Sequence, residues 1–184
     1  MAILARPLGP FAGLVAAVLF TLPPAGAQQV TEQDVKAAFL YNFTRFIDWP
    51  ANTPPGSEPF RLCVVADKTI TTAIQRTMQG ESVKGRPAET IVLGSAAEAL
   101  TCQILFIEHQ EIRRAGPMLA AVRDLPVLTV SDARGFTSRG GTIEFLLEEG
   151  RVRFDVNTEA AKRAGLSISS RLLQVARSVD GVRR

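Results

Sequence analysis

The sequence is poor in the residues from which many enzyme sites are built. It has one histidine, His109, and two cysteines, which do not form a CxxC pair. This composition disfavours a zinc site with several histidine ligands and a thioredoxin-like redox site. The chain also lacks the GxxxxGK[ST] and GxGxxG phosphate-binding loops and the GxSxG motif of serine hydrolases. We therefore expect no catalytic residue, no metal and no cofactor.

Long apolar runs are almost absent as well. The longest, residues 11–22, has about 12 residues, whereas a membrane-spanning helix needs roughly 20. The basic residue Arg6 precedes this run and Ala25-Gly26-Ala27 follows it, which is the order of a secretory signal peptide. We expect cleavage after about Ala27 and a protein that works outside the cytoplasm. A retained N-terminal anchor is the alternative.

Charge of one sign is not concentrated anywhere. The 21 lysines and arginines are scattered among 18 acidic residues, so no basic stripe suited to nucleic acid is present. Removal of residues 1–27 leaves 157 residues, which is the size of one domain. We therefore expect a single domain at 28–184 that does not bind nucleic acid.

Both cysteines, Cys63 and Cys102, lie in that domain. An oxidising compartment favours pairing of two such residues. We expect one disulfide, which in the chain-entropy model stabilises a loop of this length by roughly 4 kcal/mol.

The middle of the chain alternates compact apolar runs with amphipathic stretches. Strands are predicted at 60–66, 90–93, 103–107 and 126–130, and helices at 69–78 and 110–121. An opening helix, capped by Thr31 and Asp34, is predicted to run to Trp49-Pro50. This alternation predicts an α/β domain of three layers, with a central, mostly parallel sheet and flanking helices.

The last third has a different pattern. Segments 142–147 and 152–156 flank a turn that contains Gly150, which predicts an antiparallel hairpin at the sheet edge. A short helix is expected from Asn157 to Gly165. Ser167 or Ser169 is then expected to open a final helix whose apolar stripe extends to Val179.

Five residues are candidates for a partner or ligand surface. Asp67, Glu108 and Asp132 each follow a predicted strand, and ligands of α/β sheets usually bind at that end. As helix caps or turn residues they need no further explanation. Tyr41 and Trp49 lie on the predicted opening helix, where their aromatic rings could contact a partner protein. Most aromatic side chains on such a helix pack in the core of their own domain instead. His109 lies at a strand end beside Glu108, where we expect a surface or partly buried side chain.

Several segments resemble one family of exported bacterial proteins. They include VKAAFLYNFTRFIDWP at 35–50, CQILFIE at 102–108, GTIEFLLEEGRVRFDVN at 141–157 and GLSISSRLL at 165–173. Together, in this order, they are similar to the YfiR-like family. The resemblance implies a periplasmic α/β domain without catalysis, and it places a disulfide at Cys63 and Cys102. The second cysteine pair of well-known members, near 137–144, is missing here.

The resemblance also implies partners. Well-known members repress an inner-membrane diguanylate cyclase by binding its periplasmic sensor region, and an OmpA-like outer-membrane lipoprotein sequesters them in turn. We therefore expect a periplasmic negative regulator of cyclic di-GMP synthesis. A homodimer of this chain is a further alternative. The alternative is a periplasmic small-ligand-binding protein, with its pocket near Asp67, Glu108 and Asp132.

Overall fold

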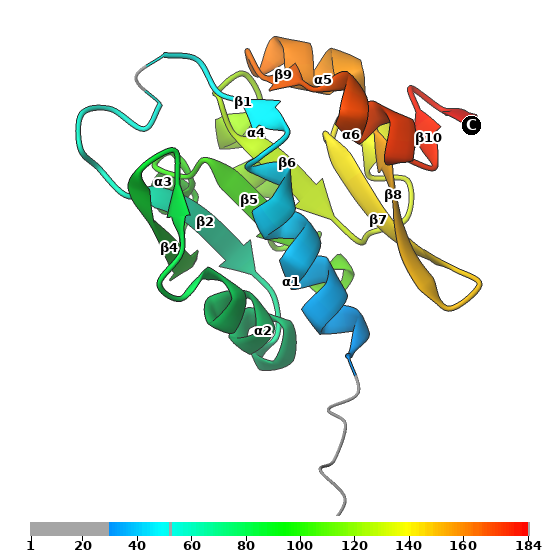
Figure 1. Cartoon of the computed structure of the whole chain (residues 1–184), viewed down its shortest axis with the longest axis horizontal. Coiled ribbons are helices and arrows are strands. Elements are labelled where there is room, and N and C mark those ends of the chain that lie inside the picture. Colours follow the sequence, from blue (N-terminus) through cyan, green and yellow to red (C-terminus); the bar gives the residue numbers. More distant parts are fainter. Residues whose placement is uncertain (1–29, 52, 184) are drawn as a thin grey trace, which may run out of the picture.

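The protein is built around one central sheet (Figure 1). The computed structural model describes residues 30–51 and 53–183, so the predicted signal peptide at 1–27 lies outside the described residues. From one edge to the other the strands are β11 (Val182–Arg183), β10 (Ser178–Val179), β8 (Arg151–Val156), β7 (Ile143–Glu148), β6 (Leu128–Ser131), β5 (Ile104–Ile107), β2 (Phe60–Val65), β4 (Arg86–Val92) and β3 (Ser82–Val83).

The middle of the sheet is parallel. Strands β4, β2, β5, β6 and β7 pair in parallel, while β8 returns antiparallel to β7. The α/β fold with a mostly parallel sheet is confirmed. The hairpin is not the edge of the sheet, however, because β10 pairs with β8 and β11 lies outside it.

Helices cover both faces of the sheet. Helices α1 (Glu32–Phe43) and α2 (Lys68–Met78) lie on one face, which we call the α1 face. Helices α3 (Ala96–Ala99) and α4 (Gly116–Val122) lie on the other, the α4 face. Successive strand residues serve opposite faces: Leu62 belongs to the core under α1, and Cys63 to the core under α4. This arrangement gives the three expected layers.

Helix α1 begins as predicted and ends early. The side chains of Thr31 and Asp34 each accept the other's backbone N–H, at 3.2 and 3.1 Å, which forms the capping box. The prediction that the helix continues to Trp49 was wrong. The helix ends at Phe43, and β1 (Ile47–Asp48) pairs with β9 (Ser167–Ile168) in a separate two-stranded sheet.

The other helical predictions are partly confirmed. The helix expected at 110–121 is divided into a 3-10 turn, η1 (His109–Glu111), and α4, whose first turn contains Pro117. The short helix α5 (Thr158–Arg163) is capped by Asn157, as expected. The prediction of a long final helix was wrong: only α6 (Ser170–Val175) is helical, and Val179 lies in β10. Among the described residues no helix is both long and apolar enough to cross a bilayer.

Candidate functional site

The three acidic candidates lie together at the carboxyl ends of neighbouring strands. Asp67, Glu108 and Asp132 follow β2, β5 and β6, which are adjacent in the sheet. Glu108 Oε2 accepts the backbone N–H of Asp67 at 2.7 Å. Asp132 Oδ1 accepts the backbone N–H of His109 at 2.6 Å. Hydrogen bonds from backbone N–H groups to carboxylates therefore link the loops that follow these three strands.

Asp67 has a second structural role, as the cap of α2. Its Oδ1 accepts the backbone N–H groups of Thr69 and Ile70 at 2.8 and 3.0 Å. These two groups would otherwise lack partners at the helix N-terminus. The carboxylate that sequence reasoning offered as a ligand residue thus already orders a helix.

Lys36 of α1 forms an ion pair at this edge of the sheet, and sequence reasoning missed it. Its Nζ lies 2.7 Å from Asp132 Oδ2 and 2.6 Å from Glu32 Oε1, and its side chain is 8% exposed. Burial by itself lowers the pKa of Lys36, but the hydrogen bonds to Asp132 and Glu32 outweigh it, so the pKa is raised. The four-residue spacing of Glu32 and Lys36 was the available signal.

Each acidic candidate therefore has a hydrogen-bond donor from the protein itself. Such an edge stabilises the fold without any ligand, because buried or half-buried carboxylates need donors. A ligand role for Asp67, Glu108 or Asp132 stays a prediction.

His109 does not take part in a recognisable catalytic arrangement. Its side chain is 56% exposed, and its Nδ1 lies 3.5 Å from Asp132 Oδ1. A triad would also need a hydroxyl or thiol hydrogen-bonded to the other ring nitrogen, and none contacts it among the described residues. Within residues 30–51 and 53–183 there is also no cluster of three or more side chains suited to a metal.

The two aromatic candidates are half-buried and anchored. Trp49 donates its indole N–H to the carbonyl of Gln103 at 3.1 Å and packs edge-on against Phe60, with ring centroids 5.0 Å apart. Tyr41 donates its hydroxyl to Glu81 at 2.5 Å, and this hydrogen bond raises its pKa. Their role at a partner surface stays a prediction, and Trp49 lies beyond the helix that was expected to carry it.

The structure contains the expected Cys63–Cys102 disulfide. The two Cα atoms are 5.8 Å apart, and both residues are buried on the α4 face, with exposures of 0% and 2%. Cys63 lies in β2 and Cys102 precedes β5, so the bond joins the segments of two adjacent strands. Because neither sulfur is accessible, this disulfide is structural in character.

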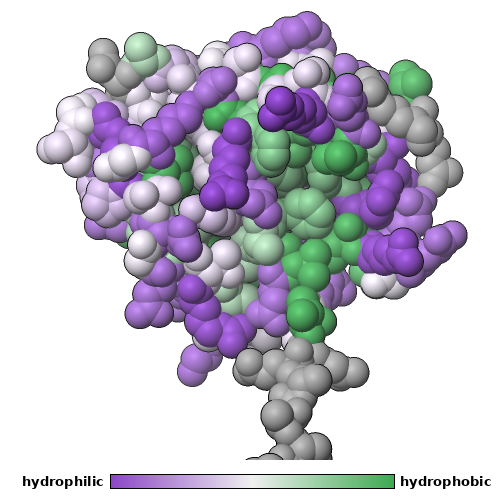
Figure 2. Space-filling model, in the orientation of Figure 1, coloured by the Kyte–Doolittle hydropathy of each residue, from purple (hydrophilic) through white to green (hydrophobic). Residues whose placement is uncertain are grey.

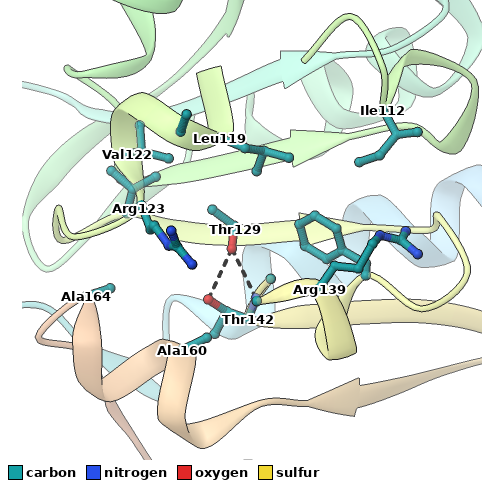
Figure 3. A pocket seen from close by; sticks show the side chains of 14 residues that line it. Ile112, Leu119, Val122, Arg123, Thr129, Arg139, Thr142, Ala160 and Ala164 are labelled. Atoms are coloured by element: carbon teal, nitrogen blue, oxygen red, sulfur yellow. Dashed lines mark hydrogen bonds between the residues drawn. The ribbon is translucent and has the colours of Figure 1, made fainter. Parts of the chain in front are cut away.

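A cavity of about 410 Å³ lies on the α4 face (Figure 3). Its floor is formed by Thr129 of β6 and Thr142, whose hydroxyls are 3.1 Å apart. Its apolar walls come from α4, from the segment between β6 and β7, and from α5. They include Leu119, Val122, Phe136, Ala160 and Ala164, and Arg123 and Arg139 also line the cavity. Sequence reasoning missed this cavity, because its walls come from segments that show no shared motif.

Comparison with known proteins places the chain in a family. No curated protein matches it. A conserved domain protein from Vibrio cholerae O1 biovar El Tor has a similar structure, with a TM-score of 0.56 at 10% identity, over 81% of this chain and 60% of that chain. This likeness shows the shared fold. The family model described as YfiR/HmsC-like matches residues 33–177. The chain therefore belongs to the YfiR/HmsC-like family.

Proposed function

We propose that this protein is a periplasmic regulator that represses an inner-membrane diguanylate cyclase by binding the cyclase's periplasmic region. The observation that carries the proposal is the family match across residues 33–177. The predicted signal peptide and the buried disulfide support a periplasmic location, because structural disulfides persist in oxidising compartments. An OmpA-like outer-membrane lipoprotein is the proposed second partner, which would sequester the regulator.

The surface best suited to the cyclase lies between α1 and the β7–β8 hairpin. We call it the α1–hairpin surface and define it by Val35, Phe39, Leu147 and Val152. Leu147 and Val152 are directly opposite each other in the hairpin, on the same face as Phe145 and Phe154. Leu147 is 58% exposed, and the other three are half-buried. Figure 2 shows apolar side chains gathered along α1 and toward the hairpin.

This surface has the composition of a binding site. Phe39 packs against Phe154 at 5.5 Å between ring centroids and still keeps part of its ring in solvent. Half-buried aromatic and aliphatic side chains that are already held in place lose little entropy on binding, so they contribute strongly to interfaces.

Repression requires only a difference in affinity. If the protein binds the inactive form of the cyclase more tightly than the active form, it shifts the cyclase toward the inactive form. A tenfold shift needs about 1.4 kcal/mol of differential binding. Binding alone can supply a difference of this magnitude, without any chemistry in the periplasm.

The first test is genetic. Deletion of the gene is expected to raise cyclic di-GMP in a strain that carries its membrane cyclase, and to leave it unchanged in a strain without the cyclase. Unchanged cyclic di-GMP in the first strain would contradict the proposal.

The second test uses matched substitutions at two exposed apolar sites. Leu147→Lys places a charge within the α1–hairpin surface, where Leu147 is 58% exposed, whereas Val92→Lys places one on β4, where Val92 is 55% exposed. We expect Leu147→Lys to abolish co-purification with the cyclase and Val92→Lys to retain it, with both variants folded by circular dichroism. Equal loss or equal retention would rule out this surface.

A further inference from the structure

We propose that the cavity on the α4 face binds a small organic carboxylate with an apolar body. This inference does not rest on the proposed regulatory function, since it concerns a different face of the sheet from the α1–hairpin surface. It is carried by three features of the lining: a hydroxyl proton without an acceptor, two uncommitted guanidinium groups and apolar walls.

The hydroxyl proton follows from the hydrogen bonds of the floor. Thr129 Oγ1 accepts the backbone N–H of Thr142 at 3.0 Å, and the two hydroxyls share one hydrogen bond at 3.1 Å. A pair of hydroxyls has two protons, and this bond uses one of them. Whichever hydroxyl donates, the other proton has no acceptor among the described residues.

The two threonine hydroxyls that share this unused proton are buried. Thr129 is 8% exposed and Thr142 is 2% exposed, and both line the cavity. A buried hydroxyl without an acceptor costs free energy, so the floor favours an occupant that offers an oxygen atom. The pattern of dashed bonds in Figure 3 shows both hydroxyls turned toward each other at the base of the cavity.

The charge of the lining is positive. Arg123 extends from the end of α4 toward the two threonines, and Arg139 of the η2 segment (Thr137–Arg139) lines the cavity with its guanidinium pointing away from them, as Figure 3 shows. Neither guanidinium has a carboxylate within ion-pair distance in the part of the chain that the structure describes. An adjoining hollow shares both arginines and is also lined by Arg163 and Asp124, so three cationic side chains and one carboxylate border it. This positive rim attracts an anion.

The walls define the rest of the ligand. Val122, Phe136, Ala160 and Ala164 are buried, and Leu119 is half-buried. The cavity of about 410 Å³ falls within the roughly 300–1,000 Å³ of small-molecule sites. An apolar body would replace water against these walls, while the carboxylate would accept from the threonine floor and pair with Arg123. An inorganic anion has no apolar body, so it would contact only the threonines and Arg123 and would leave the apolar walls uncovered.

The experiment compares an acid with its neutral amide. We expect 3-phenylpropanoate to bind the isolated protein with a dissociation constant of about 1 mM or tighter by calorimetry. We expect 3-phenylpropanamide, which has the same shape without the charge, to bind at least fivefold more weakly. Equal binding of acid and amide, or no saturation by the acid at 10 mM, would overturn the proposal.

Two variants locate the site. Arg123→Gln is expected to weaken binding of 3-phenylpropanoate at least fivefold. Arg171→Gln on α6 is the matched control, because Arg171 is also exposed and its loss removes the same charge from outside the cavity. We expect it to bind like the wild type. Equal weakening in both variants would indicate a general charge effect and would overturn the assignment of Arg123.

Nuclear magnetic resonance provides a readout that is independent of the variants. Addition of 3-phenylpropanoate is expected to shift the backbone amide signals of Thr129 and Thr142 and to leave those of Asp67 and Glu108 in place. Shifts confined to Asp67 and Glu108 would place the ligand at the acidic edge instead, and the cavity proposal would be wrong.

Discussion

The two faces of the sheet are packed by different means. On the α1 face, Phe39 and Phe43 of α1 contact Phe145 and Phe154 of the hairpin, with ring centroids between 5.3 and 5.9 Å apart. On the α4 face, aliphatic side chains surround a disulfide, and a cavity of about 410 Å³ remains. Neighbouring residues of the same strands serve both faces, so the difference lies in what covers them.

This difference indicates a division of roles. Interlocking aromatic rings bury a large apolar area, so the α1 face fixes the position of α1. A covalent bond stabilises the α4 face without requiring complete packing, because it acts largely on the unfolded chain. The α4 face therefore retains a cavity among its buried side chains, whereas the hollow on the α1 face lies between α1 and α2, away from the aromatic rings.

The largest expected effect comes from an aromatic ring of the α1 face. Phe43 is fully buried, so Phe43→Ala should lower the free energy of unfolding by about 3–5 kcal/mol, measured by urea denaturation. Phe136→Ala, also buried but beside the cavity, should cost less, because one side of its ring already lacks packing partners. An equal or greater loss of unfolding free energy for Phe136→Ala would contradict this difference in packing between the two faces.

The next effect concerns the disulfide of the α4 face. The double variant Cys63→Ala/Cys102→Ala should lose about 2–4 kcal/mol, since the closed loop has a sequence separation of 39 residues. The wild type should keep its bond in mild reductant until it unfolds, because both sulfurs are buried. Thiol labelling of the native protein with reductant present measures this. Rapid labelling below the unfolding transition would contradict a purely structural disulfide.

A third prediction concerns the ionic contact that ties α1 to the sheet. Lys36→Met should cost about 2 kcal/mol, less than the 3–5 kcal/mol of a fully buried pair, because Asp132 keeps a backbone donor. The pKa of Lys36 is raised in the folded state, so its stabilisation is complete below the unfolded pKa of about 10.4 and is lost as the pH rises through the folded value.

The pH dependence gives the control for this variant. The difference in unfolding free energy between the wild type and Lys36→Met should stay constant from pH 7 to about 10 and shrink at higher pH. If the difference in unfolding free energy grew above pH 10, the pKa of Lys36 would not be raised in the folded state.

The smallest effect is expected beside the cavity. A Cβ added at Gly141 would come within 2.2 Å of the Phe136 ring, which must then move. Overpacking usually costs about 1–3 kcal/mol, and we expect the lower end, near 1 kcal/mol, because the cavity offers the ring space. Gly141→Ala should also weaken binding of 3-phenylpropanoate, measured by calorimetry. A cost above 3 kcal/mol would show that the ring cannot use this space.

Local patterns predicted those parts of the fold that depend on local chemistry. The apolar runs predicted the central strands, Thr31 and Asp34 predicted the start of α1, and Gly150 predicted the hairpin turn, where its φ is +73°. Periodicity failed where a distant partner decides the conformation. Ile47 pairs with Ile168, and Val179 pairs with Val156, so both are strand residues despite their helical spacing.

The candidate sites show the same limit. Asp67, Glu108 and Asp132 were placed at one edge correctly, since parallel strands end on the same side. The contact of Lys36 with Asp132, and the cavity between α4 and α5, depend on how helices lie across the sheet. No spacing within a single segment reports that arrangement.

The pairing of β1 with β9 has a consequence for synthesis. Ile47 leaves α1 early in the chain, but its partner Ile168 emerges from the ribosome about 120 residues later, roughly ten seconds at ordinary translation speeds. Until then the segment after α1 has no strand to pair with, and Phe43 has no hairpin to cover it. The two-stranded sheet therefore cannot form, and the aromatic core of the α1 face cannot close, until most of the chain has been synthesised.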